Sequence, residues 1–287
     1  MALVRPFALL LLGFCGLVHA QFAEMSKRDD QSLEMLRRTI GPDASIRQRG
    51  DALIDSVASG HLRSAQWLID TGADCDYANH DGITPLMALM FSGPTEDNDD
   101  AALDALAQQG ARIVPWREGD AFAKLDSQLL VVLTSCTKQL QARNSKGAAA
   151  IHLAAIKGRF DRVHVLVKAG ADINLALPDG DRVLFMAPAS QYQQLAAEGA
   201  DVRLADLEGR TLLHHIAQSL YGDRLIDSLK KAVAIGARDR KDARGLYAAD
   251  LINGFAEQWM GLRLRDNAGV EKQLAQAKSI LRSARDR

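Results

Sequence analysis

The chain has 287 residues, of which 47% are hydrophobic and 25% are charged, a composition typical of folded proteins rather than disordered ones. Lysine and arginine number 35 and aspartate and glutamate 36, so the formal net charge is -1. This balance leaves no basic excess to neutralise a phosphate backbone, and nucleic acid is excluded as an expected partner.

Residues 1–20 are predicted to be a cleaved secretory signal peptide. One cation, Arg5, precedes an apolar run from Phe7 to Val18, and small residues lead to Ala20. The run is shorter than the roughly 20 residues that a membrane-spanning helix needs, so no membrane span is expected after cleavage. An uncleaved anchor is the alternative. The segment resembles bacterial export signals and predicts a periplasmic location.

Both ends of the remaining chain are expected to be helical caps. Apolar residues recur at helical spacing over residues 29–40, within an N-terminal cap at 21–45, and Gly41 and Pro42 end the pattern. Residues 261–287 show the same periodicity with arginines outside it, which predicts a C-terminal capping helix that packs on the preceding repeats.

A repeat of about 33 residues organises residues 46–260. Five copies begin with a Gly-Ala-Asp-like sequence and have a second glycine nine or ten residues later, and the copy before Gly147 fits the same frame with Thr137 in place of the first glycine. The second glycines are Gly82, Gly119, Gly147, Gly180, Gly209 and Gly245. Glycine provides the positive φ required where a helix ends in a tight turn. Short apolar helices between such turns must stack to share a core.

The segments after these glycines carry a recognisable motif. Residues 147–158, GAAAIHLAAIKG, resemble the ankyrin motif G-x-T-P-L-H-L-A-A-x-x-G, and residues 82–87 and 209–214 match its first half. The chain therefore resembles the ankyrin repeat family, and in particular an exported, periplasmic bacterial member. This resemblance implies an all-α ankyrin repeat solenoid of about six to seven helix-turn-helix repeats, with β-turn or hairpin fingers and helical caps.

Two departures from the repeat are informative. The spacing from Gly82 to the next repeat is long, and the excess after Gly93 is an acidic insertion at residues 94–100. The spacing from Gly180 to Gly199 is short, which predicts shortened helices there.

Chemical motifs are largely missing from the sequence. The family resemblance gives His61, His152 and His214 a role in stabilising turns. His214 and His215 are adjacent, so on a helix they lack the i, i+4 spacing of a metal-binding pair. No nucleophile motif, zinc motif or phosphate loop occurs. We therefore predict no catalytic residue, no metal site and no cofactor, and an enzyme is disfavoured.

The cysteines are expected to be unpaired. No C-x-x-C pair occurs, and Cys75 and Cys136 are placed two stacking steps apart by the repeat count. At about 8 to 10 Å for each step they would be about 20 Å apart, too far for a disulfide.

Partner binding is expected at the finger tips and the first helix of each repeat, as the family resemblance implies. The predicted residues are Trp116, Arg117, Glu118, His80, Asp81, Phe91, Asp97, Asp99, Asp100, Lys146, Asp179, Asp181 and Arg210. Trp116 and Arg117 are residue types that dominate interface energy, although Trp116 could equally fold back onto the next turn. The acidic insertion either stabilises the start of a helix or projects towards a basic partner.

The expected function is recognition of another protein. One hypothesis is an immunity or inhibitor protein that neutralises a toxic periplasmic or secreted hydrolase. The other is an accessory module that supports a periplasmic enzyme, such as a peroxide-detoxifying one. The two hypotheses predict opposite effects on the partner's activity.

Overall fold

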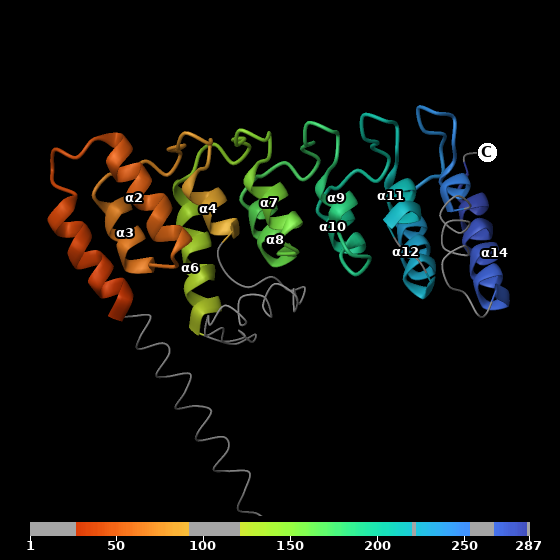
Figure 1. Cartoon of the computed structure of the whole chain (residues 1–287), viewed down its shortest axis with the longest axis horizontal. Coiled ribbons are helices and arrows are strands. Elements are labelled where there is room, and N and C mark those ends of the chain that lie inside the picture. The colour runs from red at the N-terminus through yellow and green to blue at the C-terminus, as the bar shows by residue number, and fades with distance from the viewer. Residues whose placement is uncertain (1–26, 92–120, 220–221, 253–266, 286–287) are drawn as a thin grey trace, which may run out of the picture. The chain divides into compact units, whose positions relative to one another are not determined.

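Helices joined by turns make up the described part of the chain in this computed structural model (Figure 1). The described residues are 27–91, 121–219, 222–252 and 267–285. Within them, β structure is limited to two isolated bridges, Ala205 with Thr211 and Asp239 with Arg285. The all-α prediction is confirmed. None of the described helices combines the length and apolarity needed to cross a bilayer. The chain divides into two compact units, Met1–Ser145 and Lys146–Arg287.

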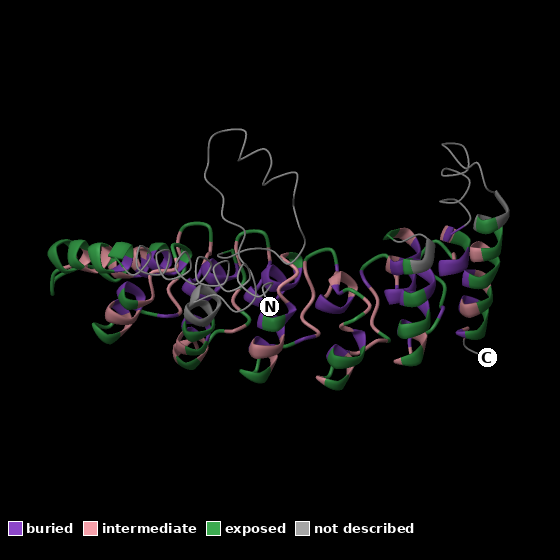
Figure 2. Cartoon of the chain, turned by 90° about the horizontal axis from the view of Figure 1, so that it is seen from below, coloured by how far each residue is buried: buried purple, intermediate pink, exposed green. Residues whose placement is uncertain are grey.

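The first unit contains a helix at 27–39 followed by four helices that pack in neighbouring pairs. These four are α2 (Ile46–Ala58), α3 (Leu62–Asp70), α4 (Pro85–Phe91) and α6 (Ala121–Cys136). The start of α2 is fixed locally, since the Ser45 hydroxyl accepts from the Gln48 amide and the Gln48 side chain accepts from the Ser45 amide. Fully buried leucines such as Leu53, Leu68 and Leu133 line the faces between helices (Figure 2). Each contributes about 1.5–3 kcal/mol by leaving water.

The helix at 27–39 caps α3 through a buried carboxylate. His61, at the N-cap position of α3, makes no side-chain cap bond. The Asp29 carboxylate instead accepts hydrogen bonds from the amides of Arg63 and Ser64, at 2.8 and 3.1 Å. Because the first amides of a helix have no partner within it, this contact attaches the N-terminal helix to α3.

The sequence-based repeat register is wrong in the first unit. We counted a separate repeat from Gly119 to Gly147, but α6 packs against both α3 and α4. It therefore takes the place of the second helix in the repeat that α4 begins. The acidic insertion and the finger expected at Gly110 to Gly119 lie outside the described residues.

The expectation of unpaired cysteines is also wrong, because Cys75 and Cys136 are joined by a disulfide. The error in the repeat register explains this mistake. Their α-carbons are 5.9 Å apart, within the usual range for a bridge. One stacking step separates them, not two, since α6 lies directly beside α3. Next to the bridge, the Asp76 carboxylate accepts from the amides of Lys138 and Gln139 at 3.1 to 3.2 Å.

The second unit continues the pattern of paired helices. Its helices are α7 (Ala150–Ile156), α8 (Phe160–Lys168), α9 (Val183–Met186), α10 (Tyr192–Ala197), α11 (Leu212–Ser219), α12 (Gly222–Ala234), a short helix at 248–252, and α14 (Asn267–Ser283). The prediction of shortened helices after Gly180 is confirmed, because α9 has four residues and α10 six.

Helix α14 packs against α12, as expected for a terminal helix that covers the core. Ala277 and Leu281 are fully buried. The segment after α14 is also attached, because the Asp239 amide donates to the Ala284 carbonyl at 3.0 Å. The Arg285 guanidinium lies 3.9 Å from the centre of the Tyr247 ring. These contacts close the C-terminal end of the second unit.

Candidate protein-binding surface

The turns between successive helix pairs project from one end of the helices in each unit (Figure 1). We call these turns fingers. Finger 1 comprises residues 71–84, finger 2 residues 137–149, finger 3 residues 169–182, finger 4 residues 198–211 and finger 5 residues 235–247. Finger 2 spans the boundary between the two units, whereas fingers 3 to 5 belong to the second unit.

An Asn or Asp side chain folds the tip of three fingers in the same way. In finger 4, Asp206 Oδ1 accepts from the amides of Glu208 and Arg210 at 2.9 and 2.8 Å. Asn79 in finger 1 and Asp242 in finger 5 make the corresponding pair of bonds. These residues satisfy turn amides that the helices leave unpaired, which rigidifies the tips.

Main-chain hydrogen bonds connect each finger tip to the next within a unit. In the second unit the Leu207 amide donates to the Asp179 carbonyl at 3.3 Å, and the Ala243 amide donates to the Glu208 carbonyl at 2.8 Å. In the first unit the Ser145 amide donates to the Asp81 carbonyl at 2.8 Å. The fingers therefore present a preorganised surface, which reduces the entropy lost on binding.

Close approach of the tips requires glycine at position 180. Gly180 has a φ of +91°, and a Cβ atom there would lie 2.5 Å from the Leu207 nitrogen. A side chain would thus be strained by the backbone conformation and would also collide with the next finger.

Two of the three turn histidines have the predicted role. His152 Nδ1 accepts from the Ala149 amide at 3.1 Å, and its Nε2 lies 2.9 Å from the Leu175 carbonyl of finger 3. His214 makes the corresponding contacts with Thr211 and with Leu246 of finger 5. Each imidazole thus joins its own finger to the following one.

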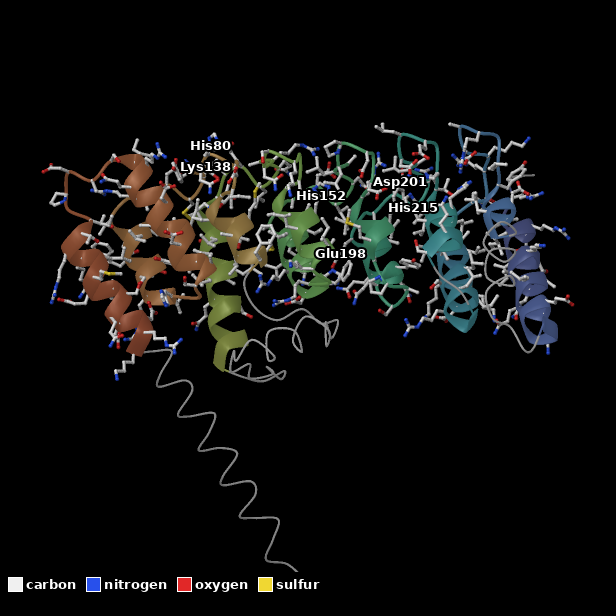
Figure 3. The ribbon with its side chains drawn as sticks, in the orientation of Figure 1. His80, Lys138, His152, Glu198, Asp201 and His215 are labelled. Atoms are coloured by element: carbon white, nitrogen blue, oxygen red, sulfur yellow. A yellow bond between two sulfur atoms is a disulfide. The ribbon has the colours of Figure 1, made fainter. Side chains whose placement is uncertain are left out.

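The predicted binding residues occupy different environments on these fingers. His80, Asp81, Lys146 and Asp179 are exposed, and Figure 3 shows His80 on its finger. Asp181 and Arg210 are partly buried, and Phe91 at the end of α4 is 50% exposed. The remaining predicted residues, Trp116, Arg117, Glu118, Asp97, Asp99 and Asp100, lie outside the described residues.

Two exposed apolar side chains among the described residues of the second unit were missed by the sequence analysis. Ile156 at the end of α7 is 58% exposed and Leu207 at the tip of finger 4 is 76% exposed. Ile156 follows Gly147 by nine residues, as Phe91 follows Gly82, so alignment of the repeats could have identified it. Exposed apolar side chains on a finger tip and on the first helix of a repeat are candidate contacts for a protein partner.

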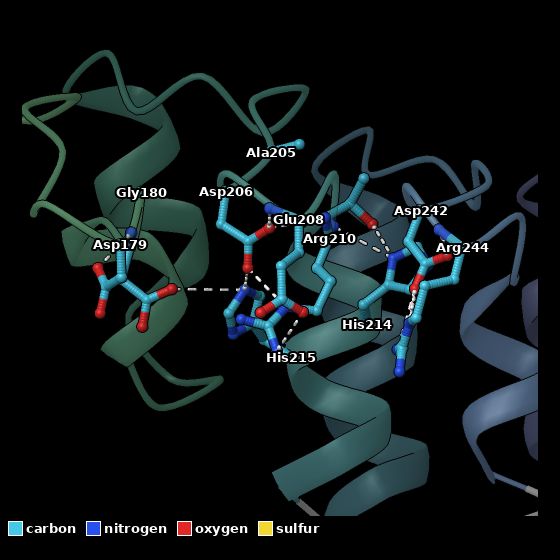
Figure 4. A network of polar contacts seen from close by, with 12 residues as sticks. Asp179, Gly180, Ala205, Asp206, Glu208, Arg210, His214, His215, Asp242 and Arg244 are labelled. Carbon is cyan, nitrogen blue, oxygen red and sulfur yellow. Dashed lines mark hydrogen bonds and ion pairs between the residues drawn. The ribbon is translucent and has the colours of Figure 1, made fainter.

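A cluster of four ionisable residues lies between fingers 3 and 4 and the start of α11 (Figure 4). We call Asp181, Asp206, Arg210 and His215 the inter-finger cluster. Arg210 Nε donates to Asp206 Oδ2 at 2.6 Å, and His215 Nε2 lies 3.2 Å from the same oxygen and 3.6 Å from Asp181 Oδ1. The His215 ring stacks on Phe185 with 4.5 Å between ring centres. Sequence reasoning brought none of these residues together.

Burial and neighbouring charges shift the pKa values of this cluster, and for His215 and Asp206 they act in opposite directions. Burial lowers the pKa of His215, although the neighbouring Asp181 and Asp206 carboxylates act to raise it. Burial raises the pKa of Asp181, and the charges of Asp179 and Asp206 add to that rise. Burial also acts to raise the pKa of Asp206, but hydrogen bonds from Arg210 outweigh it and leave that pKa below its ordinary value.

A separate apolar groove lies in the first unit. It has a volume of about 840 Å³ and is lined by the helix at 27–39, α3 and α6, including Trp67 and Val131. Val131 is 62% exposed. The groove is formed by helices and not by fingers, so it provides a matched comparison for any test of finger binding.

Comparison with known proteins identifies the fold. Residues 52–97 match a family model described as ankyrin repeats (many copies), and residues 146–176 match the ankyrin repeat model. A solved ankyrin repeat protein, EF0377, aligns with a TM-score of 0.56 at 16% identity, covering 82% of this chain and 98% of that one.

This is an ankyrin repeat fold.

Other similar proteins resemble only part of this chain or only its fold. The Notch-regulated ankyrin repeat-containing proteins of Homo sapiens and Xenopus laevis are 36% identical over 67 residues. That alignment covers 23% of this chain and 59% of each relative, so the chain matches less than two thirds of their length.

A further structural neighbour comes from a protein complex. The structure of the Bd0816 predatory endopeptidase from Bdellovibrio bacteriovorus in complex with immunity protein Bd3460 contains a chain that aligns with a TM-score of 0.50 and 20% identity. The alignment covers 72% of this chain and 93% of that one. Ankyrin repeats are a protein-binding fold, and these comparisons add no catalytic family.

Proposed function

We propose that this ankyrin repeat protein is a periplasmic immunity protein, which binds a toxic hydrolase and blocks its activity. The observation that carries the proposal is the rigid finger surface with Leu207 76% exposed at the tip of finger 4, together with Ile156, which is 58% exposed at the end of helix α7. Bonds between fingers hold this surface in place before a partner arrives. A preorganised surface suits tight inhibition because little conformational entropy is lost on binding.

Two further features support this assignment. A chain with a similar fold comes from the complex of an endopeptidase with an immunity protein, which supports an immunity role. The disulfide between Cys75 and Cys136 suits an oxidising compartment, in agreement with the proposed signal at residues 1–20. Intact mass spectrometry of the exported protein should show loss of residues 1–20 and retention of the bridge.

The central experiment is purification of the mature protein, with its bound partner, from the periplasm of its own host. We expect a stoichiometric hydrolase whose activity is suppressed in the complex and returns when the complex is dissociated. A partner that stays active or gains activity would overturn inhibition in favour of an accessory role.

Site-directed variants then locate the surface. Ile156→Glu and Leu207→Glu should each weaken the affinity by about tenfold or more, the loss typical of a central interface side chain. The matched control is Val131→Glu, which changes a similarly exposed apolar residue in the groove of the first unit. If only the control variant lost affinity for the partner, the binding site would lie in that groove and the finger surface would be rejected.

Trp116 and Arg117 remain a predicted anchor of the same interface. Replacing both with alanine should weaken partner binding without unfolding the repeats. Unchanged affinity in a titration would remove that tip from the binding site.

A further inference from the structure

The inter-finger cluster brings three possible metal ligands together. Asp181 comes from finger 3, Asp206 from finger 4 and His215 from α11, and one ligand atom of each lies within 4.8 Å of the other two. Figure 4 shows Asp206 and His215 facing each other. From this arrangement we propose that Asp181, Asp206 and His215 form a binding site for a divalent transition-metal ion, with Zn²⁺ as the best fit.

The separations between the ligand atoms suit a small tetrahedral ion. His215 Nε2 is 3.2 Å from Asp206 Oδ2 and 3.6 Å from Asp181 Oδ1. Bonds of about 2.0–2.1 Å in a tetrahedral zinc site place neighbouring ligand atoms about 3.3 Å apart. Only small side-chain movements would therefore be needed to enclose the ion.

An unsatisfied oxygen in the cluster points to a ligand independently of these distances. Asp181 Oδ1 is buried and has no hydrogen-bond partner. A buried acceptor without a partner is unfavourable because it has lost its hydrogen bonds to water. Neutral His215 has a single N–H, and its Nε2 lies closer to Asp206 than to Asp181. A cation between the three residues would satisfy the Asp181 oxygen.

Arg210 does not block this site. Its Nε donates to Asp206 Oδ2, but a carboxylate oxygen has two lone pairs, and the second is directed towards His215. The guanidinium offsets one of the two aspartate charges. A divalent ion would then leave the cluster with a single positive charge, partly balanced by Glu208, which lies 3.4 Å from Arg210.

The donor types favour zinc over the common hard cations. One imidazole nitrogen and two carboxylate oxygens suit Zn²⁺, whereas Ca²⁺ takes six to eight oxygens and Mg²⁺ takes an octahedral oxygen shell. Asp206 is fully buried, the His215 side chain is 15% exposed and Asp181 is 31% exposed. The ion would enter on the Asp181 side, where water could complete the fourth position.

Such a site would join fingers 3 and 4 through side chains as well as through the backbone. This inference does not depend on the proposed immunity function, because metal binding is measured on the isolated protein. The proposal of a metal site can be refuted while the proposal of partner inhibition is upheld, and partner inhibition can be refuted while the metal site is upheld.

The test is isothermal titration of Zn²⁺ into the untagged mature protein after removal of metals with EDTA and dialysis. We expect one equivalent of Zn²⁺ to bind, and excess Mg²⁺ not to displace it. His215→Ala and Asp181→Asn should each weaken binding at least about tenfold, since loss of even an outer partner of a metal ligand costs 10–100-fold. Circular dichroism confirms that each variant is folded, and the partly exposed Asp181 provides a mild substitution if His215→Ala is unstable.

His80→Ala is the matched control, because His80 is an exposed finger histidine in the first unit. Its affinity for Zn²⁺ should equal that of the unmodified protein. Failure of the unmodified protein to bind Zn²⁺, or equal binding by the His215 and Asp181 variants, would overturn the proposal. Loss of binding in His80→Ala alone would assign the ion to another site and would overturn it too.

Discussion

The disulfide allows a quantitative prediction about the stability of the first unit. Cys75 and Cys136 are 61 residues apart in sequence, so the bridge closes a long loop in the unfolded chain. In the chain-entropy account, a loop of this length restricts the unfolded state by about 4 kcal/mol at room temperature. Replacing both cysteines with alanine should lower the free energy of unfolding by about this amount.

The assay is guanidinium unfolding of the oxidised mature protein and of the double variant, followed by circular dichroism. Hydrogen exchange should assign the loss to residues 27–91 and 121–145, because stability in repeat proteins depends mainly on neighbouring repeats. A reducing agent should destabilise the unmodified protein in the same way and leave the double variant unchanged, which is the internal control.

A loss below about 1 kcal/mol would refute the loop-closure reasoning. Equal loss of exchange protection in both units would refute the assignment to the first unit. Persistence of two free thiols in the protein isolated from its host would instead reject the pairing itself.

Three further predictions concern the fingers of the second unit. His152→Ala should destabilise the fold by about 1–3 kcal/mol in urea unfolding, because it removes the partner of the buried Ala149 amide and of the partly buried Leu175 carbonyl, whereas His80→Ala should not. Gly180→Ala should cost at least about 1–2 kcal/mol from its positive φ, and more than Gly158→Ala, because a Cβ at position 158 meets nothing within 4 Å. Burial acts to raise the pKa of Asp242, but backbone and Arg244 hydrogen bonds outweigh it and lower that pKa. The ionised Asp242 carboxylate stabilises the folded state fully at pH values above its ordinary pKa of 3.8, and this stabilisation is lost as the pH falls through the lower pKa of the folded state. The melting temperatures of wild type and Asp242→Asn should therefore converge in acid.

Local patterns in the sequence were sufficient to predict the repeat fold. The glycines at the fingers, the apolar spacing of the short helices and the motif around His152 each depend on residues close together in the chain. These features correctly predicted an all-α structure and the short helices α9 and α10. The family resemblance correctly predicted the contacts of His152 and His214, though not a capping bond from His61. They succeed because turn geometry and helix amphipathicity are set within one repeat.

The insertion after α4 led the same reasoning to a wrong repeat register and a wrong prediction for the cysteines. Glycines at 110 and 119 fit the spacing of a finger, and counting them as one placed Cys136 a step too far from Cys75. Spacing alone could not reveal that α6 packs against α3 and α4. The partner of a helix is chosen by the apolar surface that stacking buries, and insertions do not change that surface.

The sequence by itself determined the type of fold, the position of the fingers outside the insertion, and the histidines that join them. The tertiary structure alone decided the pairing of Cys75 with Cys136 and the meeting of Asp181, Asp206 and His215. Both depend on which fingers lie side by side, and the main-chain bonds and packing between repeats fix that choice. Residues within a repeat are positioned by local rules, whereas contacts between repeats require the register of the whole stack.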